Sequence, residues 1–407
     1  MALIVQKFGG TSVGSVERIR QVAEKVKGFR QRGDDLVVVV SAMSGETNRL
    51  IDLARQIQAE PDARELDVIV STGEQVTIGL LAMALKAIDV PAVSYTGAQV
   101  RIVTDSAFNK ARIQKIDDEA IRADLSAGKV VIVAGFQGVD EQGNITTLGR
   151  GGSDTTGVAL AAALKADECQ IYTDVDGVYT TDPRVVESAR RLDKITFEEM
   201  LEMASLGSKV LQIRSVGFAK KYNIPVHVRS SFSEEEGTMV VNEDSGMEQL
   251  VVSGVTHDLN QARITLKKVP DQPGIAAKIF GPIAENGIVV DMIIQNISEE
   301  GRTDLTFSCP TNQVSLAEKA LADAKAAGDI NFHDIIADQG VAKVSVVGIG
   351  MRSHAGVAAK MFSTLRDENI NIKVITTSEI KISVLIDRKY MELAVQALHD
   401  VFGLEAA

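Results

Sequence analysis

The sequence predicts an α/β protein in which helices sandwich a mainly parallel sheet and two smaller ferredoxin-like domains follow. Three observations lead to this prediction. In the first 230 residues, runs of β-branched residues alternate with helical patterns. Near residue 231 the sequence becomes polar and rich in turn residues. Beyond that, Gly274–Phe280 recurs as Gly356–Phe362, an offset of 82 residues.

The elements of the first half follow from their apolar patterns. Leu36–Val40 is apolar at every position, which is typical of a strand buried on both faces of a parallel sheet. Helical spacing of apolar residues separates the strands. The expected strands are Ala2–Phe8, Leu36–Val40, Lys129–Ala134 and Glu168–Thr173. The expected helices cover residues 13–31, 46–58, 62–88 and 155–165.

The second half contains a duplicated module. Without gaps, the two copies share seven identities over twenty positions, and similar strand patterns flank both. Each copy predicts the order strand, helix, strand, strand, helix, strand, which is the ferredoxin-like βαββαβ pattern. A chance match between two amphipathic helices is the less favoured alternative. We expect a linker at 231–250 and domains at 1–245, 246–340 and 341–407.

Composition excludes several classes of protein. A length of 407 residues suggests two to three domains, and 45% apolar with 24% charged residues is typical of a globular chain. The net charge of −12 argues against nucleic-acid binding. Cys169 and Cys309 form no metal or disulfide pattern. No membrane span or signal peptide is expected, so the cytoplasm is the predicted location.

A glycine cluster, Lys7–Ser12 (KFGGTS), directly follows the first strand. Its glycines allow backbone N–H groups to approach an oxyanion, and the lysine adds positive charge. The helix that follows presents its N-terminus to the same place. An ordinary turn between strand and helix explains the cluster equally well, so both interpretations stay open.

A second cluster is Thr147–Thr156 (TLGRGGSDTT), which precedes an alanine-rich helix. Ser153 or Asp154 is expected to cap that helix. A cap does not explain Arg150 between glycines, which is suited to hold a carboxylate or phosphate through two hydrogen bonds. We therefore predict an anion-binding site here.

The remaining clusters are less specific. Tyr172–Arg184 follows a strand, where ligands of open α/β sheets gather, and its tyrosines and arginine suit a nucleotide. A structured loop explains it equally well. Ser41–Thr47 follows the second strand, and Ser71–Glu74 lies in a predicted helix. On pattern alone, Glu74 is predicted to be an ordinary exposed helix residue.

Several motifs are absent from the sequence. GxxxxGK[ST], HRD and DFG do not occur, which excludes P-loop enzymes and protein kinases, and no GxGxxG follows a strand. All five histidines lie outside the glycine clusters. This argues against catalysis by histidine and against a histidine-rich metal site. The histidines are His227, His257, His333, His354 and His399.

Four segments together resemble, in order and spacing, the signatures of the aspartate kinases, which belong to the amino acid kinase family. They are Lys7–Ser12, Val40–Met43, Thr147–Thr156 and Tyr172–Arg184. Val269–Gly274 and its distant copy resemble two ACT domains, which are amino-acid-sensing modules. The resemblance covers essentially the whole chain. It is strongest to the bacterial type that lysine and threonine regulate.

The resemblance implies transfer of a phosphoryl group from MgATP to the side-chain carboxylate of L-aspartate. The product is 4-phospho-L-aspartate, on the route to lysine, threonine, methionine and diaminopimelate. A carboxylate is already ionised at neutral pH, so this reaction needs no general base. It needs positioning and positive charge, because the carboxylate and the triphosphate repel each other. Magnesium is expected to arrive on the nucleotide, without a protein metal cage.

The resemblance also implies roles for single residues. Lys7 neutralises charge on the transferring phosphoryl group, Arg150 clamps the α-carboxylate of aspartate, and Asp154 helps place the metal-bound phosphates; these three form the implied catalytic set. Glu74 takes the α-ammonium group. The implied substrate-binding residues are Ser41, Thr47, Glu74, Arg150, Gly151, Gly152 and Ser153. The implied ATP-binding residues are Lys7, Gly9, Gly10, Thr173, Asp174, Tyr179, Arg184 and Lys209.

The ACT domains are implied to pair with those of another chain and to bind effectors at that interface. The assembly would be a homodimer, or an α2β2 form whose separate regulatory half starts at Met247. The implied threonine site contains Asp271, Gln295, Asn371 and Ile372, and the implied lysine site contains Asp291 and Ser298. For Ile372, a plain core position remains the alternative. The copies differ, with Pro273 before the glycine in one and Ala355 in the other.

Other interpretations remain. A kinase for glutamate, acetylglutamate or a nucleotide shares the implied fold, but lacks the Thr147–Thr156 segment and usually the ACT pair. A non-catalytic amino-acid sensor is disfavoured because Lys7, Glu74, Arg150 and Asp154 are all present. A bifunctional kinase–homoserine dehydrogenase is not expected, because the sequence leaves no room for a dinucleotide-binding domain.

Overall fold

A computed structural model describes residues 2–207, 210–243, 251–296 and 301–405. The chain divides into two compact units. The first contains Met1–Tyr179, Arg191–Ser205 and Lys209–Ser245, and the second contains Thr180–Arg190, Leu206–Ser208 and Gly246–Ala407. The expected domain limits stay predictions. The division departs from them at Thr180–Arg190, which lies far from residue 245 in sequence but belongs to the second unit.

The first unit is built on an eight-stranded sheet with the order β10-β12-β11-β9-β1-β2-β6-β3. All neighbouring strands are parallel except β11 and β12. The mainly parallel sheet predicted from the sequence is therefore confirmed. The strands are β1 (Leu3–Phe8), β2 (Asp35–Val40), β3 (Ala92–Tyr95), β6 (Val130–Ala134), β9 (Glu168–Thr173), β10 (Lys194–Thr196), β11 (Val226–Ser230) and β12 (Thr238–Val241).

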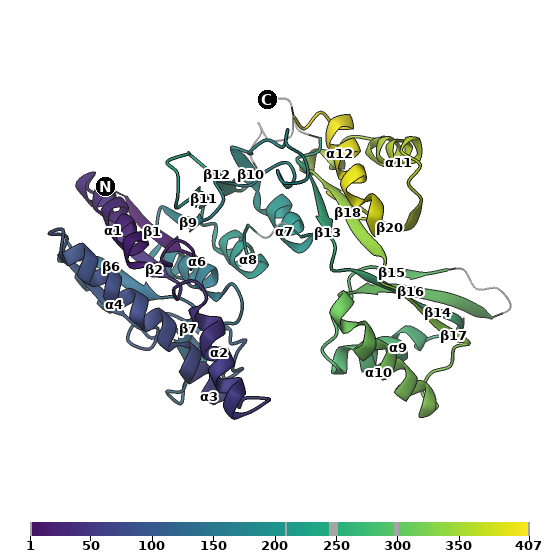
Figure 1. The fold of residues 1–407 in the computed structure, drawn as a ribbon, viewed down its shortest axis with the longest axis horizontal. Helices are drawn as coiled ribbons and strands as arrows, with labels where there is room; N and C mark the ends of the chain where they lie inside the picture. Colours follow the sequence, from purple (N-terminus) through teal and green to yellow (C-terminus); the bar gives the residue numbers. More distant parts are fainter. Residues whose placement is uncertain (1, 208–209, 244–250, 297–300, 406–407) are drawn as a thin grey trace. The chain divides into compact units, whose positions relative to one another are not determined.

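Helices cover both faces of this sheet (Figure 1). Alternate strand residues such as Phe8, Leu36 and Ile132 form one apolar core with α1 and α4. The other residues of the strands face the side where α6 packs on β1, β2 and β9. The helices are α1 (Val16–Gln31), α2 (Glu46–Ile57), α3 (Ala63–Val70), α4 (Thr72–Lys86), α5 (Glu119–Ser126), α6 (Gly152–Leu164), α7 (Phe197–Ser205) and α8 (Ile213–Tyr222).

Two predicted helices have different limits in the structure. The helix expected over 62–88 is interrupted at Ser71, so α4 begins at Thr72 and its first turn contains Glu74. The helix expected from residue 155 already begins at Gly152. Its N-cap is Gly151 in the left-handed conformation, so the predicted cap by Ser153 or Asp154 is wrong. Both changes place functional candidates in the first turn of a helix.

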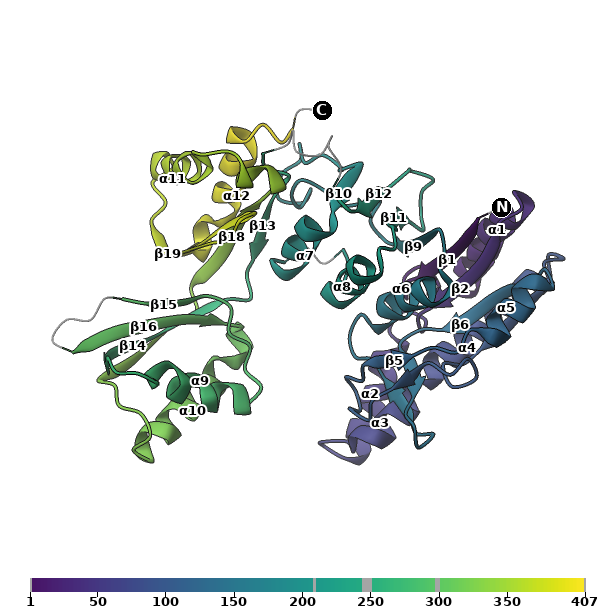
Figure 2. The same cartoon turned by 180° about the vertical axis from the view of Figure 1, so that it is seen from behind.

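A smaller four-stranded sheet, with the order β5-β4-β7-β8, also belongs to the first unit. Figure 2 shows it from behind, together with α5 beside β6. Its last strand leads directly into the Gly149–Gly151 segment before α6. The strands are β4 (Val103–Thr104), β5 (Ile113–Lys115), β7 (Gln137–Val139) and β8 (Ile145–Thr147).

By length and composition alone, one stretch of the described residues, Ala63–Lys86, could cross a membrane. It consists of α3 and α4, and about half of its most apolar part is buried inside the fold. Ile78, Leu81 and Leu85 pack in the core beneath α1. The core thus accounts for the apolar composition of this stretch.

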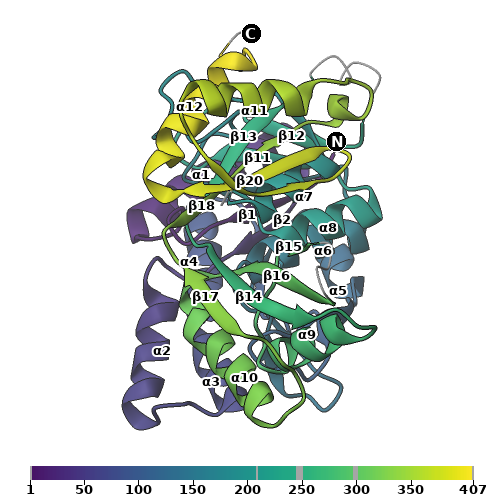
Figure 3. The ribbon, with the colours of Figure 1, turned by 90° about the vertical axis from the view of Figure 1, so that its right-hand side faces the viewer.

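The second unit contains two small antiparallel sheets, each with two helices (Figure 3). The first module has the predicted order βαββαβ, and its sheet order is β15-β16-β14-β17. Its elements are β14 (Ala262–Pro270), α9 (Ile275–Glu285), β15 (Ile293–Gln295), β16 (Arg302–Cys309), η2 (Thr311–Gln313), α10 (Val314–Ala326) and β17 (Asp334–Asp338).

The second module departs from the predicted order, because its fourth strand comes from an earlier part of the chain. Its sheet order is β13-β18-β20-β19, and β13 (Gly254–Asp258) precedes the first module in sequence. Because α12 comes last among its described helices and strands, the pairing of β13 with β18 supplies the fourth strand. The other elements are β18 (Val341–Val347), η3 (Ile349–Arg352), α11 (Val357–Asp367), β19 (Ile372–Thr377), β20 (Lys381–Asp387), η4 (Arg388–Tyr390) and α12 (Met391–Val401).

Candidate active site

The candidate site lies at the carboxyl edge of the parallel strands in the first unit. Backbone hydrogen bonds also join neighbouring segments of the chain just beyond the strand ends. The Gly9 amide donates to the Tyr172 carbonyl at 3.2 Å, and the Gly135 amide donates to the Val40 carbonyl at 3.0 Å. The Ser41 amide donates to the Phe8 carbonyl at 3.1 Å. The predicted clusters after β1, β2 and β9 therefore lie side by side.

An ion pair joins the first and second glycine clusters. Lys7 Nζ, from β1, lies 2.6 Å from Asp154 Oδ1, in the first turn of α6. Each side chain is only 11% exposed. The chain can bring α6 this close because position 157 is glycine, where a Cβ atom would lie 3.2 Å from that of Lys7. The pair places a cation and an anion at the same edge of the sheet.

The sequence pattern predicted an exposed Glu74, and this prediction is wrong. Glu74 is buried, with 3% of its surface accessible. One carboxylate oxygen accepts a hydrogen bond from the Ala42 amide at 3.0 Å. The other oxygen, Oε2, is buried and has no hydrogen-bond partner among the described residues. Burial raises the pKa of Glu74 to about 7, against the opposing effect of the Ala42 hydrogen bond. Such an oxygen is suited to a positively charged ligand group.

Glycine is required where two segments of the site approach each other. A Cβ atom at Gly135, just beyond β6, would lie 2.7 Å from the hydroxyl oxygen of Ser153. A Cβ atom at Gly10 would lie 3.1 Å from the Ala42 carbonyl oxygen. Ser153 thus lies close to the end of β6, and the Ser41–Thr47 segment lies close to the first glycine cluster. Thr47 itself is half-buried in the first turn of α2.

Arg150 is exposed, and it has no ion-pair or hydrogen-bond partner in the described part of the chain. The glycines on either side, Gly149 and Gly151, both have positive φ angles of 77° and 73°. This conformation favours glycine and turns the backbone sharply on both sides of the arginine. The guanidinium group is thus available to an anionic ligand, and its binding of one stays a prediction.

Asp67 is a residue that sequence analysis missed. It is fully buried on α3, and its carboxylate accepts hydrogen bonds from the Asn109 amide, the Thr147 amide and the Thr147 hydroxyl. Burial raises its pKa, while these hydrogen bonds act in the opposite direction. On the other side of the same segment, Arg214 donates to the Leu148 carbonyl at 2.6 Å. Both side chains fix the segment that carries Arg150. The only signal in the sequence was that Asp67 lies three positions before the apolar Val70, and therefore on the same face of the predicted helix.

The predicted ATP-binding residues do not all belong to one unit. Thr173 ends β9, and Asp174 follows it on the surface. The half-buried Tyr179 donates its hydroxyl to Asp176 at 2.9 Å. Arg184 belongs to the second unit, where it is exposed and forms an ion pair with Asp182 at 2.7 Å. Lys209 lies outside the described residues.

The predicted threonine-site residues of the second unit are mostly exposed. Gln295 donates to Asp271 at 3.5 Å, the limit of a hydrogen bond, at one end of β15. Asn371 is exposed just before β19. Ile372 is half-buried and packs against the apolar core of the second module, as the alternative interpretation of this position predicted.

Of the two predicted lysine-site residues, the structure describes only Asp291. Asp291 forms an ion pair with Lys343, whose residue is only 2% exposed in β18. Ser298 lies outside the described residues, as does Met247. The ion pair joins the two modules of the second unit. Asp291 therefore already has a charged partner within the chain.

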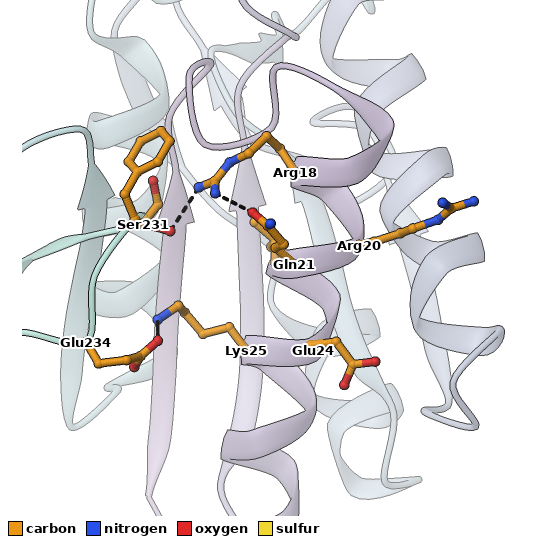
Figure 4. A pocket seen from close by; sticks show the side chains of 9 residues that line it. Arg18, Arg20, Gln21, Glu24, Lys25, Ser231 and Glu234 are labelled. Atoms are coloured by element: carbon orange, nitrogen blue, oxygen red, sulfur yellow. Dashed lines mark hydrogen bonds and ion pairs between the residues drawn. The ribbon is translucent and has the colours of Figure 1, made fainter.

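A depression of about 600 Å³ lies beside α1 in the first unit (Figure 4). Arg18 donates to the Ser231 carbonyl at 2.9 Å, and its guanidinium lies 3.9 Å from the centre of the Phe232 ring. Lys25 forms an ion pair with Glu234 at 2.6 Å. The lining contains none of the predicted site residues. Its Ser231 hydroxyl nevertheless donates to the carbonyl of Thr173, a predicted nucleotide contact, at 3.2 Å, so the depression adjoins the candidate site. The described residues contain no cluster of three or more His, Cys, Asp or Glu side chains that could hold a metal ion.

Comparisons with known proteins agree across the whole chain. Residues 2–230 match the model of the amino acid kinase family, and residues 263–326 and 344–402 match ACT domain models. An aspartate kinase from Pseudomonas fluorescens strain SBW25 is 67% identical over 409 aligned residues, covering 100% of this chain and 98% of the relative.

Two solved structures of Escherichia coli aspartokinase III are also similar, each 29% identical. The complex with aspartate and ADP in the R-state has a TM-score of 0.81, and the complex with lysine and aspartate in the T-state has a TM-score of 0.79. Both matches cover 98% of this chain and 99% of the other. The similarity thus includes the sheet that carries the candidate site and both modules of the second unit.

Proposed function

This chain belongs to the aspartate kinases of the amino acid kinase family, and we propose that the residues gathered at the edge of its large sheet carry that activity. The proposed reaction transfers the γ-phosphoryl group of MgATP to the side-chain carboxylate of L-aspartate. A carboxylate oxygen forms a bond to the γ-phosphorus, and the bond to the β-phosphate breaks. The products are 4-phospho-L-aspartate and ADP.

The buried Glu74 carboxylate is the observation that carries the substrate assignment. Its unpartnered oxygen is suited to the α-ammonium group of aspartate, which would compensate a buried negative charge. Arg150 would hold the α-carboxylate through two hydrogen bonds. Ser41, Thr47 and Ser153 would hydrogen-bond substrate or phosphate, and Gly151 and Gly152 would offer backbone amides. A substrate with both an ammonium group and two carboxylates matches this set of groups.

Lys7 is proposed to supply the main positive charge in phosphoryl transfer. Its ammonium group would lower the repulsion between the aspartate carboxylate and the triphosphate, and stabilise charge on the transferring group. Asp154 holds Lys7 at 2.6 Å and would help place the magnesium ion that arrives with ATP. Gly9 and Gly10 would donate backbone hydrogen bonds to phosphate oxygens. Thr173, Asp174, Tyr179, Arg184 and Lys209 are the proposed contacts to the nucleotide.

We propose that lysine and threonine inhibit the enzyme through its ACT domains. E. coli aspartokinase III has been solved with bound lysine, which supports lysine as an effector of this chain. Asp271, Gln295, Asn371 and Ile372 form the proposed threonine site. Asp291 and Ser298 form the proposed lysine site, although Asp291 would have to share or exchange its Lys343 partner.

The effector sites are proposed to be completed by a second chain. In each module one edge strand carries an exposed isoleucine at the equivalent repeat position: Ile293 in β15 is 51% exposed, and Ile375 in β19 is 43% exposed. Exposed apolar edges favour pairing with another strand or chain. A homodimer fits this arrangement. An α2β2 form with a regulatory half starting at Met247 is the alternative, and the cytoplasm is the proposed location.

ADP release tests the proposal directly. The protein is incubated with MgATP, with or without L-aspartate, and then with lysine and threonine singly and together. Release that depends on aspartate and falls with both amino acids is expected. Matched assays with glutamate and acetylglutamate check the other kinase activities. A folded protein that binds ATP but releases no ADP with any of these substrates would instead favour the non-catalytic sensor.

A further inference from the structure

The segment Thr180–Arg190 directly follows the predicted nucleotide residue Tyr179, yet it is built into the second unit. Val186 is 6% exposed and lies in the apolar core of the second ACT module. The side chain of Gln396, on α12, donates to the Val185 carbonyl at 3.1 Å. The segment is therefore packed as part of the regulatory module, although its sequence belongs to the catalytic half.

Thr180 is held by four hydrogen bonds within the second unit. Its amide donates to the Arg190 carbonyl at 2.8 Å, and its carbonyl accepts from the Val255 amide, in β13, at 2.7 Å. Its hydroxyl accepts from the Arg190 amide at 3.0 Å. The same hydroxyl is hydrogen-bonded to Nε2 of His399, on α12, at 2.9 Å. Both Thr180 and His399 are 0% exposed.

The residue on the other side of Tyr179 is held within the first unit. The Val178 amide donates to the Thr238 hydroxyl at 2.8 Å, and the Val178 carbonyl accepts from the Leu192 amide at 2.8 Å. Tyr179 thus lies between one neighbour fixed by the catalytic unit and one fixed by the regulatory unit. Any change in the backbone at Thr180 acts on Tyr179 through a single peptide bond.

We propose that Thr180 and His399 are positioning residues for nucleotide binding. Their buried hydrogen bond lets the second ACT module fix the end of the nucleotide loop, which we define as residues 173–184 after β9. The proposal rests on the nucleotide role of Tyr179 and Arg184 in the proposed function. Thr180 and His399 themselves do not have to touch ATP. Weakening their hydrogen bond frees the backbone next to Tyr179 and raises the entropy lost when the loop closes on the nucleotide.

The chemistry of the pair is consistent with a permanent structural link. Burial lowers the pKa of His399, against the opposing charges of Asp400 and Glu405, so the imidazole is neutral at neutral pH. A neutral imidazole hydrogen-bonds a hydroxyl without leaving a charge in the core. Removing either partner leaves the other as a buried polar group without this bond, which is unfavourable.

The test removes the hydrogen bond from either side in the full chain. Thr180→Val and His399→Leu remove it, whereas Thr180→Ser and His399→Gln keep a group able to form it. Gln396→Ala loosens the same segment from the protein surface. Met361→Ala, on α11 in the same core, lowers stability without removing a hydrogen bond of the segment. Each variant is measured for the KM of ATP, the KM of aspartate, kcat, thermal stability and the Kd of ADP by calorimetry.

Thr180→Val and His399→Leu should each raise the KM of ATP and the Kd of ADP by about fivefold, the factor that one hydrogen bond represents. The KM of aspartate should stay unchanged, the Ser and Gln variants should resemble the wild type, and the double variant should add little to either single one. Gln396→Ala should give a smaller shift in the same direction.

Unchanged nucleotide affinity in the folded Val, Leu and Ala variants at these three positions would overturn the proposal. So would an equal loss of affinity in Met361→Ala, because it would reflect stability alone. The calorimetric Kd separates this result from failure of the proposed function. A wild type without aspartate-dependent ADP release would contradict the function, and ADP affinity would still test the role of the pair.

Discussion

The two sets of candidate residues differ in how completely a single chain builds them. As whole residues, Lys7, Asp154 and Glu74 are at most 8% exposed, and each has a partner within the same unit. Gln295 and Asn371, in contrast, are exposed at or beside edge strands. The difference indicates that the proposed catalytic residues are already held in place within the first unit, whereas the proposed effector residues lie on exposed edges that a further surface would have to complete. Preformed charge is an advantage for phosphoryl transfer, because it needs no reorganisation during the reaction.

The largest effect is expected from Lys7. Lys7→Ala should lower kcat by a factor of about 100 or more, since it removes a charge aimed at the transferring phosphoryl group. It also leaves Asp154 buried without its cation, so folding should be checked by circular dichroism. Lys25→Ala is a matched control, because Lys25 lies beside the depression of Figure 4 and pairs with Glu234. Its kcat should stay within about twofold of the wild type, because its partner Glu234 is exposed and is not one of the predicted site residues. Wild-type turnover in folded Lys7→Ala would remove Lys7 from the mechanism.

Glu74 should control aspartate rather than ATP. Glu74→Gln should raise the KM of aspartate by at least about tenfold, because a charge-assisted hydrogen bond to the α-ammonium group is lost. The KM of ATP should change little. Steady-state kinetics with each substrate varied separately measures both values. Equal changes in the two constants would contradict the assignment and indicate a general distortion of the site.

The same residue predicts two opposite pH dependences. The folded-state pKa of Glu74, raised from 4.5 to about 7, stabilises the unliganded fold fully below pH 4.5, and this contribution is lost as pH rises through about 7. The loss is roughly 3 kcal/mol relative to Glu74→Gln. Aspartate affinity should instead rise over this range, because only the ionised carboxylate attracts the ammonium group. Urea unfolding and aspartate binding are measured between pH 5 and 8 in the wild type and in Glu74→Gln. Equal pH dependences in the two proteins would contradict the prediction.

A smaller effect is expected at Asp67, which holds the Arg150 segment from behind. Asp67→Asn should lower the free energy of unfolding by about 2 kcal/mol, since an amide nitrogen would face backbone donors. It should also raise the KM of aspartate a few-fold. Asp62→Asn is the control, because Asp62 only caps α3 by accepting from the Glu65 amide. A change in stability alone, without any change in KM, would show that Asp67 does not position the site.

The smallest effect on basal turnover is expected in the second unit. Gln295→Ala should leave kcat without effectors unchanged and raise the threonine concentration for half-inhibition by about tenfold. Lys319→Ala, at an exposed position on α10 of the same module, should change neither quantity. Inhibition curves for lysine and threonine, singly and together, measure the effect. A lower basal kcat in Gln295→Ala would contradict the separation of the two sites.

Point substitutions are preferable to removing the regulatory half. A chain cut at residue 247 would lose β13 and α12, which hold Thr180 through Val255 and His399. It would also expose Val186, which is buried in the core of the second ACT module. Inhibition lost by such a truncation would therefore not distinguish a missing effector site from a damaged nucleotide loop.

The sequence predicted the architecture well, because its signals are local. Fully apolar strands such as Leu36–Val40 require cover on both faces, and this requirement alone favours a parallel sheet with helices on each side. The strand predicted at Glu168–Thr173 has the observed limits. The repeat predicted two similar modules. These features depend on neighbouring residues, so the sequence was enough to find them. The anion-binding role of the glycine clusters stays a prediction.

Tertiary structure alone decided which residues are buried together. Helical spacing predicted an exposed Glu74. In the structure a new helix begins at Thr72, and the Glu74 side chain is hydrogen-bonded to the Ala42 amide and buried. The same holds for Asp67, whose partners are 42 and 80 residues away in sequence. The borrowed strand β13 and the transfer of Thr180–Arg190 to the second unit also follow from long-range pairing. Such contacts depend on the free energy of the whole fold, and no local pattern encodes them.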